Sequence, residues 1–291
     1  MRPAPALLQK LTRSRLLVRQ AVASRGVGER KSRAKGSGIE FADHREYQPG
    51  DDARHIDLHL HARLGTHFIR QYSVFQQLPV TIVVDGSESM AYGTPDKFGF
   101  ATLLAGTLGF AALAGGDSVS VAVMSGGRLH WSPRLSGARR AEILFEWLEE
   151  QKPRGTAPFG QAIAETMPKL AAQGLLILIS DWWSEDVEAD LRSLRAGGHE
   201  VVGIQVVSPE EADPGRLGGG DLRLVDAETG HEVELALDRA TLDRYAAAFA
   251  EWRGKVRQQL LRVGGRFVEA RTDDDPERLI LQDWRRAGLI S

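Results

Sequence analysis

The sequence predicts an α/β domain with a doubly wound, mainly parallel sheet. From Leu78 onward, apolar strand-like runs alternate with helix-like segments, the order that produces a parallel sheet covered by helices. The run 80–84 is β-branched and mainly apolar, and the run 175–180 is continuously apolar, as expected of a strand that is buried on both faces. An aspartate follows each run, Asp85 and Asp181, at the strand ends where such sheets bind ligands.

The part of the chain before Leu78 is less regular. We expect a helix, a polar linker, a charged stretch without a clear period and a strand, in that order, over residues 7–23, 25–38, 39–66 and 67–75. The sequence therefore predicts two domains. Residues 1–77 form an N-terminal helical and basic arm with a signature segment, and residues 78–291 form the α/β domain.

Periodicity and turn residues divide the α/β domain into its elements. The expected strands are 80–84, 118–124, 128–133, 175–180, 200–207 and 266–270, with 128–133 as an edge strand in a hairpin. The expected helices are 97–114, 138–150, 159–172, 185–196 and 238–263. A two-stranded excursion, 222–226 with 231–236, precedes the last helix.

The composition is that of a soluble globular protein, with 42% apolar and 26% charged residues among 291. The absence of cysteine excludes disulfides, thiolate zinc sites and cysteine nucleophiles, and it fits a cytoplasmic location. Residues 98–116 are uncharged and about long enough to span a bilayer. Because they are rich in Gly and Ala and lie between two strand-like runs, we favour a buried crossover helix and expect no integral membrane span.

Charge is distributed unevenly along the chain. Residues 1–38 contain ten Lys and Arg against the single acid Glu29, although the whole chain has a net charge of −2. Such an arm can bind nucleic acid or anionic lipid, or it can dock on the acidic remainder of its own chain. No aromatic residue for base stacking precedes Phe41. We therefore favour docking or a solvated arm, and we expect no nucleic-acid partner.

Hard oxygen ligands gather around the two aspartates. Asp85, Ser87 and Ser89 alternate on one tight turn, and Asp181 ends a second strand. Thr156 precedes a predicted helix and can offer a hydroxyl to the same point. Carboxylate and hydroxyl oxygens suit Mg²⁺. The alternative is that both aspartates only cap helices and turns.

The order Asp-x-Ser-x-Ser, followed by Thr156 and Asp181, resembles the metal-ion-dependent adhesion site of von Willebrand factor type A domains over about residues 78–273. The resemblance implies that Ser87, Ser89 and Thr156 bind the metal directly. Asp85 and Asp181 bind it directly or through its waters. The metal would be Mg²⁺, with Mn²⁺ or Ca²⁺ as alternatives, and a partner's carboxylate would complete its shell. Glu88 and Met90 are expected at the rim of that contact surface.

A second motif spans residues 36–57 and continues through Ala62-Arg63 and 68–71. It resembles the hallmark of the family called domain of unknown function 58, although this chain has Ile56-Asp57-Leu58-His59 where members typically have Ile-Asp-Trp-Lys. The resemblance implies an adaptor that links a MoxR-type AAA+ ATPase to a client protein, in complex assembly or maturation.

Three further groups of residues allow more than one interpretation. The arginines Arg45, Arg54 and Arg63 alternate with acids, which favours a structural lattice over a partner-binding role. A second group is a set of four histidines, for which a zinc site is one possible interpretation: His55, His59, His61 and His67. Trp182 and Trp183 offer a contact patch beside the metal, or they pack against the upstream segment.

An enzyme is the main competing class. The second aspartate of haloacid-dehalogenase phosphatases is replaced by Ser87, and neither a Walker loop nor a Gly-x-Ser-x-Gly elbow is present. A Mg²⁺-dependent phosphoester hydrolase with Asp85 at its centre remains the alternative function. Because the sequence places no general base near Asp85, we predict a binding protein and not an enzyme.

Overall fold

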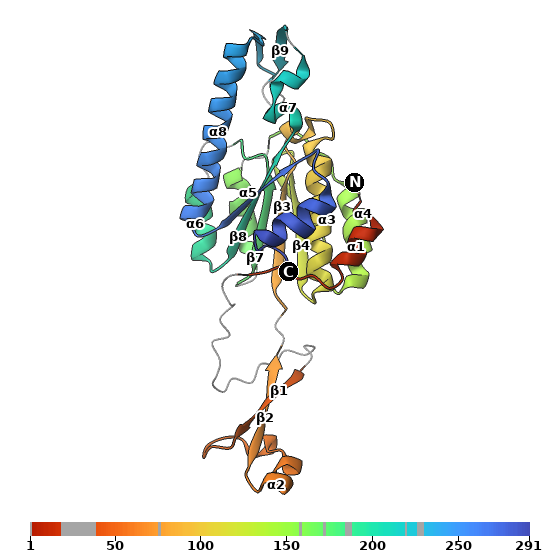
Figure 1. Cartoon of the computed structure of the whole chain (residues 1–291), viewed down its shortest axis with the longest axis vertical. Coiled ribbons are helices and arrows are strands. Elements are labelled where there is room, and N and C mark those ends of the chain that lie inside the picture. The colour runs from red at the N-terminus through yellow and green to blue at the C-terminus, as the bar shows by residue number, and fades with distance from the viewer. Residues whose placement is uncertain are drawn as a thin grey trace. The chain divides into compact units, whose positions relative to one another are not determined.

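The computed structural model describes residues 2–18, 39–74, 77–156, 159–170, 173–183, 188–218, 220–225 and 230–291. The chain divides into two compact units (Figure 1). The larger unit, called here the sheet domain, comprises residues 1–23 and 78–291. The smaller unit, called here the inserted unit, comprises residues 24–77.

The sheet domain is built on one seven-stranded sheet with the order β11-β8-β7-β3-β4-β5, and β6 also pairs with β4. The pairs from β11 to β4 are parallel, while β5 and β6 are antiparallel to β4. The strands are β3 Pro79–Asp85, β4 Ser118–Ser125, β5 Arg128–Trp131, β6 Leu135–Ser136, β7 Leu175–Ser180, β8 Glu200–Val207 and β11 Arg266–Arg271. The predicted doubly wound, mainly parallel sheet is confirmed.

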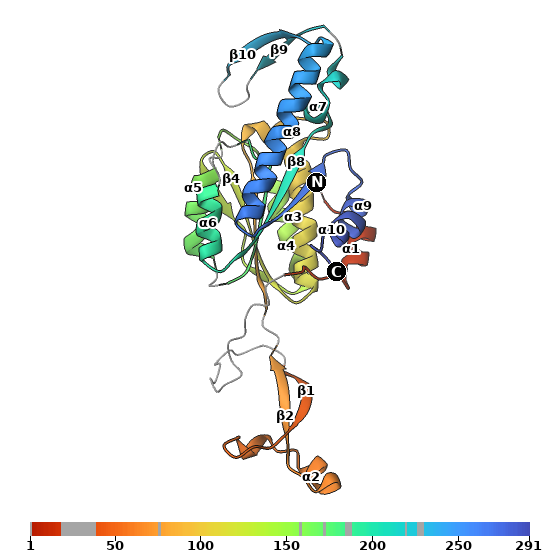
Figure 2. The same ribbon diagram turned by 60° about the vertical axis from the view of Figure 1, so that its left-hand side comes forward.

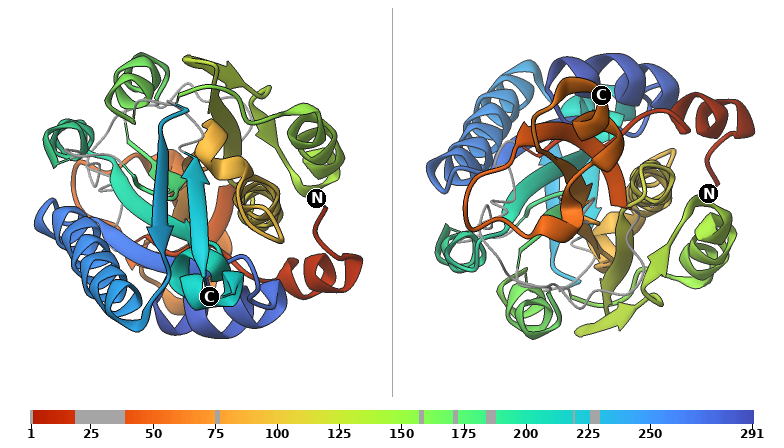
Figure 3. Two further views of the ribbon diagram at one scale, coloured as in Figure 1. Left: turned by 90° about the horizontal axis from the view of Figure 1, so that it is seen from above. Right: turned by 90° about the horizontal axis from the view of Figure 1, so that it is seen from below.

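Helices cover both faces of the sheet (Figures 2 and 3). On one face lie α3 Lys97–Ala114, α4 Ala141–Glu150 and α1 Pro5–Leu11, and on the other lie α5 Phe159–Thr166, α6 Glu188–Ala196 and α8 Arg239–Arg262. Alternate residues of a strand point to opposite faces. In β3, Ile82 therefore joins the core under α3, while the adjacent Val83 joins the core under α6 and α8.

The uncharged segment that is long enough to span a bilayer, residues 98–116, forms helix α3 and the turn that follows it. It is the one helix among the described residues that is long and apolar enough to cross a bilayer, and 83% of it is buried inside the protein. It packs between the sheet and α4. Burial by its own domain explains why this helix is apolar on all sides, since no face of it is left for water.

Both ends of the chain contribute to the sheet domain. The predicted division after residue 77 agrees with the two units, but residues 1–23, predicted as part of the N-terminal domain, belong to the sheet domain. Helix α1 ends at Leu11, well before the predicted end at Ala23, and it packs on α3 through Leu7 and Leu11. Residues 19–23 lie outside the described part. Leu16 forms a β-bridge with Ile290. This arrangement buries the apolar face of the first segment on the domain that the sequence analysis treated as separate.

A buried arginine fastens these terminal segments. The guanidinium of Arg266 donates to the carbonyls of Leu17 and Gly288, at 2.6 Å each. It also forms an ion pair with Glu200 at 2.7 Å.

The sequence did not predict three short helical segments near the end of the chain: α9 Pro276–Arg278, a π-helical turn at Leu279–Asp283 and α10 Trp284–Arg286.

The inserted unit contains β1 Ile39–Glu46 and β2 Phe68–Val74, which pair antiparallel, with α2 Leu58–Leu64 between them. The sequence predicted β2 but gave no clear period for β1. Asp57 caps α2 by accepting from the backbone N–H groups of His59 and Leu60. Arg45 pairs with Asp51 at 2.8 Å, one contact of the predicted arginine lattice.

A two-stranded extension follows β8, as predicted. It consists of β9 Asp221–Val225 and β10 Glu232–Ala236, which pair antiparallel. Between β8 and β9 lie the short helix α7 Pro209–Ala212 and a 3₁₀ turn at Pro214–Leu217. The turn expected at 228–230 falls largely on residues outside the described part.

Candidate metal centre

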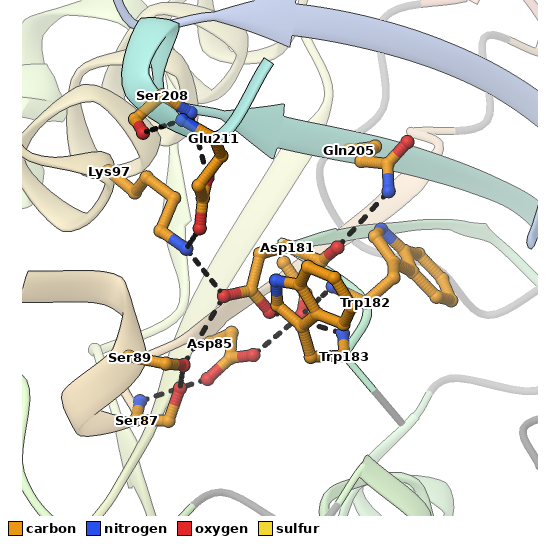
Figure 4. A network of polar contacts seen from close by, with 11 residues as sticks. Asp85, Ser87, Ser89, Lys97, Asp181, Trp182, Trp183, Gln205, Ser208 and Glu211 are labelled. Carbon is orange, nitrogen blue, oxygen red and sulfur yellow. Dashed lines mark hydrogen bonds and ion pairs between the residues drawn. The ribbon is translucent and has the colours of Figure 1, made fainter. Parts of the chain in front are cut away.

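The two predicted aspartates converge at the carboxyl edge of the sheet. Strands β3 and β7 are parallel neighbours, with Val84 opposite Ile179. Asp85 therefore ends β3 beside Ser180, and Asp181 follows directly. This is the point at which the strand order reverses, because β4 lies on one side of β3 and β7 on the other. Ser180 donates its hydroxyl to Asp85 Oδ2 at 2.6 Å (Figure 4).

The turn after β3 brings both serines to this edge. A Cβ at Gly86 would lie 2.7 Å from the carbonyl oxygen of Met124, so only glycine fits there. The backbone N–H of Ser87 donates to Asp85 Oδ1 at 2.9 Å. The hydroxyls of Ser87 and Ser89 are 2.9 Å apart, and that of Ser89 donates to Asp181 Oδ2 at 3.2 Å. Four of the five predicted ligands thus form one hydrogen-bonded cluster.

Thr156, the fifth predicted ligand, lies on an adjoining loop. That loop is joined to the serine turn by two backbone hydrogen bonds of 2.8 Å, from Arg154 to the carbonyl of Gly86 and from Glu88 to the carbonyl of Gly155. The side chain of Glu88 also accepts from the N–H of Gly155 at 3.3 Å. Thr156 is exposed. Its loop is therefore placed beside the cluster, while its hydroxyl remains a predicted ligand.

Lys97 is a member of the site that the sequence analysis missed. Its side chain is 1% exposed, and its ammonium group donates to Asp181 Oδ2 at 2.8 Å and to Glu211 Oε1 at 2.5 Å. Lys97 begins α3, and Glu211 belongs to α7 (Figure 4). The only local signal was a lysine at the start of an otherwise apolar helix.

Burial and neighbouring charges set the protonation of the site. Burial, together with the charge of the nearby Asp181, raises the pKa of Asp85 to about 6, against the lowering effect of hydrogen bonds from Ser180 and Ser87. Burial alone would lower the pKa of Lys97, but the carboxylates of Asp181 and Glu211 outweigh it and raise that pKa overall. Lys97 is therefore a permanent cation at the edge of the cluster.

These oxygens fit a small hard cation. Adjacent ligands of an octahedral Mg²⁺ shell lie about 3 Å apart, since each lies about 2.1 Å from the ion. The two spacings along Ser87, Ser89 and Asp181 are 2.9 and 3.2 Å. Every donor of the set is a carboxylate or hydroxyl oxygen, the type that Mg²⁺ prefers. The ammonium of Lys97 shows that the same carboxylate already attracts a cation.

The zinc interpretation gains no support. Among the described residues, no group of three or more His, Asp and Glu side chains is arranged to hold a metal ion. The rings of His61 and His67 stack, with centroids 4.1 Å apart. His44, which was not part of the predicted set, lies 3.0 Å from the carboxylate of Asp57.

The two tryptophans after Asp181 have separate roles. Trp182 is buried under α8 and donates its indole N–H to the carbonyl of Ile204 at 3.0 Å. Trp183 is 53% exposed and stacks on Trp252 of α8, with ring centroids 4.0 Å apart.

The rim of the site differs from the prediction at Met90. This residue, expected at the rim, is fully buried, because the short 3₁₀ turn after Ser87 directs it into the core.

This sheet and its edge cluster define a doubly wound α/β domain, consistent with the von Willebrand A-like fold that the resemblance implied. The chain belongs to the family described as Protein of unknown function DUF58, whose pattern matches residues 43–255. It is 29% identical over 283 residues to Uncharacterized protein Rv1480 of Mycobacterium tuberculosis (strain H37Rv) and equally to Uncharacterized protein Mb1516 of Mycobacterium bovis. Each alignment covers 93% of this chain and 86% of the relative.

Similar solved structures include BatB from Bacteroides thetaiotaomicron, which is 18% identical with a TM-score of 0.44. That match covers 72% of this chain and 98% of BatB. The SpRpn10 VWA domain is 10% identical with a TM-score of 0.42, and the match covers 72% of this chain and 95% of that domain.

Proposed function

We propose that this protein is a metal-ion-dependent protein-interaction module. Ser87, Ser89 and Thr156 hold Mg²⁺, or Mn²⁺ or Ca²⁺ in its place, and Asp85 and Asp181 bind it directly or through its waters. The observation that carries the proposal is the chain of oxygens from Ser87 through Ser89 to Asp181. These groups come from the ends of two neighbouring strands, and their spacing fits an octahedral shell.

The donor set favours binding a partner over catalysing a reaction. A cation held by neutral hydroxyls and only two carboxylates remains electrophilic, and it attracts a further carboxylate from outside. Both oxygens of Asp85 already accept hydrogen bonds, from Ser87 and Ser180. Asp181 accepts from Ser89 and Lys97 on one oxygen and from the backbone of Trp183 on the other. These hydrogen bonds orient the carboxylates as ligands.

The partners follow from the family resemblance. We propose that the module binds a MoxR-type AAA+ ATPase and a client protein, with the carboxylate of one of them completing the metal shell. The exposed face of Trp183, beside Asp181, adds apolar contact area at the same edge. In this role the protein is an adaptor in complex assembly or maturation.

Metal binding is tested first. Mn²⁺ titrated into the purified protein is expected to bind with one-to-one stoichiometry and to raise the melting temperature by mass action. Ser89→Ala is expected to abolish both effects. The matched control is Ser136→Ala, an exposed serine in β6. A wild-type protein whose melting temperature is unchanged by millimolar Mg²⁺ and Mn²⁺ would refute the metal site.

Partner binding is tested second. Capture of a purified MoxR-type ATPase from the same organism by the immobilised protein is expected with Mg²⁺ and is expected to be lost with EDTA. Asp181→Asn is expected to behave like the EDTA sample. Equal capture with Mg²⁺, with EDTA and by Asp181→Asn would contradict a metal-bridged contact while leaving metal binding itself intact.

A further inference from the structure

Lys97 is an unusual residue to find beside a cation site. An ammonium group that is 1% exposed has lost nearly all of its hydration, which is costly unless opposite charges replace the water. Two carboxylates do so here, Asp181 after β7 and Glu211 of α7, and both contact the ammonium group (Figure 4). The ion triad is therefore part of the site itself.

Lys97 contacts the oxygen that the metal site requires. Asp181 Oδ2 accepts both from Lys97 Nζ at 2.8 Å and from Ser89 Oγ at 3.2 Å. The lysine therefore shares the carboxylate oxygen that faces the serine hydroxyls. Two cations bound to one oxygen repel each other strongly in a poorly hydrated site. Metal binding and the contact between Lys97 and Asp181 thus oppose each other.

Glu211 is a second carboxylate that balances the charge of Lys97. One oxygen of Glu211 accepts from Lys97, and the other accepts from the backbone N–H of Ser208 at 2.9 Å. Ser208 in turn accepts from the N–H of Glu211 at 3.1 Å, which completes a capping box on α7. The carbonyl of Glu211 accepts from the hydroxyl of Tyr245 on α8 at 2.8 Å. Glu211 is therefore a fixed anion on the side of Lys97 away from the serines.

We propose that Lys97 is a built-in competitor for the metal, which holds Asp181 in the metal-free protein and releases it when the metal binds, keeping its existing contact with Glu211. This inference rests on the proposed metal site. It holds that Lys97 and Glu211, which are not metal ligands, adjust the affinity of that site for the metal. Lys97 offsets part of the negative charge of Asp181 and Glu211 when no metal is present. It also weakens metal binding relative to a site without the lysine.

The test is a titration of Mn²⁺ into four proteins: wild type, Lys97→Met, Glu211→Gln and the double variant. Lys97→Met is expected to bind Mn²⁺ about tenfold more tightly than wild type or better, because the competing cation is gone. Glu211→Gln is expected to bind several-fold more weakly, because Lys97 then has Asp181 as its only anion. In the Lys97→Met background, Glu211→Gln is expected to change the affinity by less than about twofold.

A second lysine–glutamate pair provides the matched control. Lys255 and Glu251 pair at 2.7 Å on the exposed face of α8. Lys255→Met and Glu251→Gln are expected to leave Mn²⁺ affinity unchanged. Circular dichroism checks that every variant is folded before the titration. If Lys97→Met does not fold without metal, Glu211→Gln decides alone, and an affinity equal to or tighter than wild type overturns the proposal.

The outcomes separate this inference from the proposed function. Equal Mn²⁺ affinity in wild type and Lys97→Met overturns the competition and leaves the metal site standing. Equal weakening by Glu211→Gln in both backgrounds also overturns it, because Glu211 would then act directly on the metal and not through Lys97. Folded wild type and variants that all fail to bind Mn²⁺ refute both the inference and the metal site.

Discussion

The hydroxyl of Ser180 donates to Asp85 Oδ2 at 2.6 Å, so the last residue of β7 fixes the carboxylate that ends β3. The oxygen of the same hydroxyl accepts from the backbone N–H of Trp182 at 2.9 Å. Trp182 has a φ of 66°, which turns the chain away from the strand direction after Asp181. One buried side chain thus orients one aspartate and supports the bend that follows the other.

Ser180→Ala is expected to weaken Mn²⁺ binding several-fold and to lower the free energy of unfolding by about 1–3 kcal/mol. The stability loss follows because the buried N–H of Trp182 would be left without its acceptor. Urea unfolding and Mn²⁺ titration measure the two effects, with Ser136→Ala as control. An unchanged Mn²⁺ affinity in a destabilised Ser180→Ala protein would show that Asp85 needs no fixed orientation.

Gly86→Ala is expected to lower the free energy of unfolding by about 1–3 kcal/mol and to impair metal binding. The added methyl would meet the carbonyl oxygen of Met124 at 2.7 Å and a methyl group of Val123 at 2.9 Å, so the turn must shift. Gly254→Ala is the control, because nothing lies within 4 Å of a Cβ there in helix α8. That change is expected to stabilise the helix by up to about 1 kcal/mol. Urea unfolding of both variants decides, and similar losses at both positions would contradict the steric account.

Trp183→Ala is expected to reduce capture of the ATPase or client while the free energy of unfolding falls by about 1–3 kcal/mol. The side chain is half exposed and rests on Trp252, so truncation loses about half of the area that a fully buried tryptophan would lose. Trp182→Ala, by contrast, is expected to destabilise by about 3–5 kcal/mol because that side chain is buried. Capture assays and urea unfolding separate the two, and unchanged capture by Trp183→Ala removes it from the contact surface.

His199 is expected to make the sheet domain less stable in mild acid. Burial lowers the pKa of His199 below its ordinary value, so the unfolded chain binds a proton at a pH where the folded protein does not. The stability that this residue contributes is complete above the ordinary histidine pKa of about 6.5 and is lost as the pH falls through the folded value. Melting temperatures between pH 7 and 5 are expected to fall less steeply for His199→Gln than for wild type. The exposed His130, changed to Gln, serves as control. Parallel curves for wild type and His199→Gln would contradict this assignment.

The sequence predicts the sheet well because its signals are local. The runs 80–84 and 175–180 are long, apolar and β-branched enough to be assigned as buried strands without knowledge of their neighbours. Asp85 and Asp181 could be placed together because parallel strands present their carboxyl ends at one edge. The inserted unit was less predictable, since the apolar residues of β1 are confined to its first half and residues 43–46 are all polar.

What the sequence could not predict depends on contacts between distant residues. Lys97 and Glu211 are 114 positions apart, and no periodic pattern connects them. Leu16 and Ile290 meet at a β-bridge although they lie near opposite ends of the chain. The N-terminal helix therefore carries no local sign that it belongs to the sheet domain. Its apolar stripe indicates only that it must pack on something.

The inserted unit enters and leaves the sheet domain at two points, because residues on both sides of it belong to that domain. Its exit runs into β3, which begins at Pro79, two residues after Gln77, and ends at Asp85. A strand of this length extends roughly 23 Å and is held by a parallel neighbour along each edge. The chain therefore runs from the family signature directly into β3, and the metal turn follows at the other end of that strand.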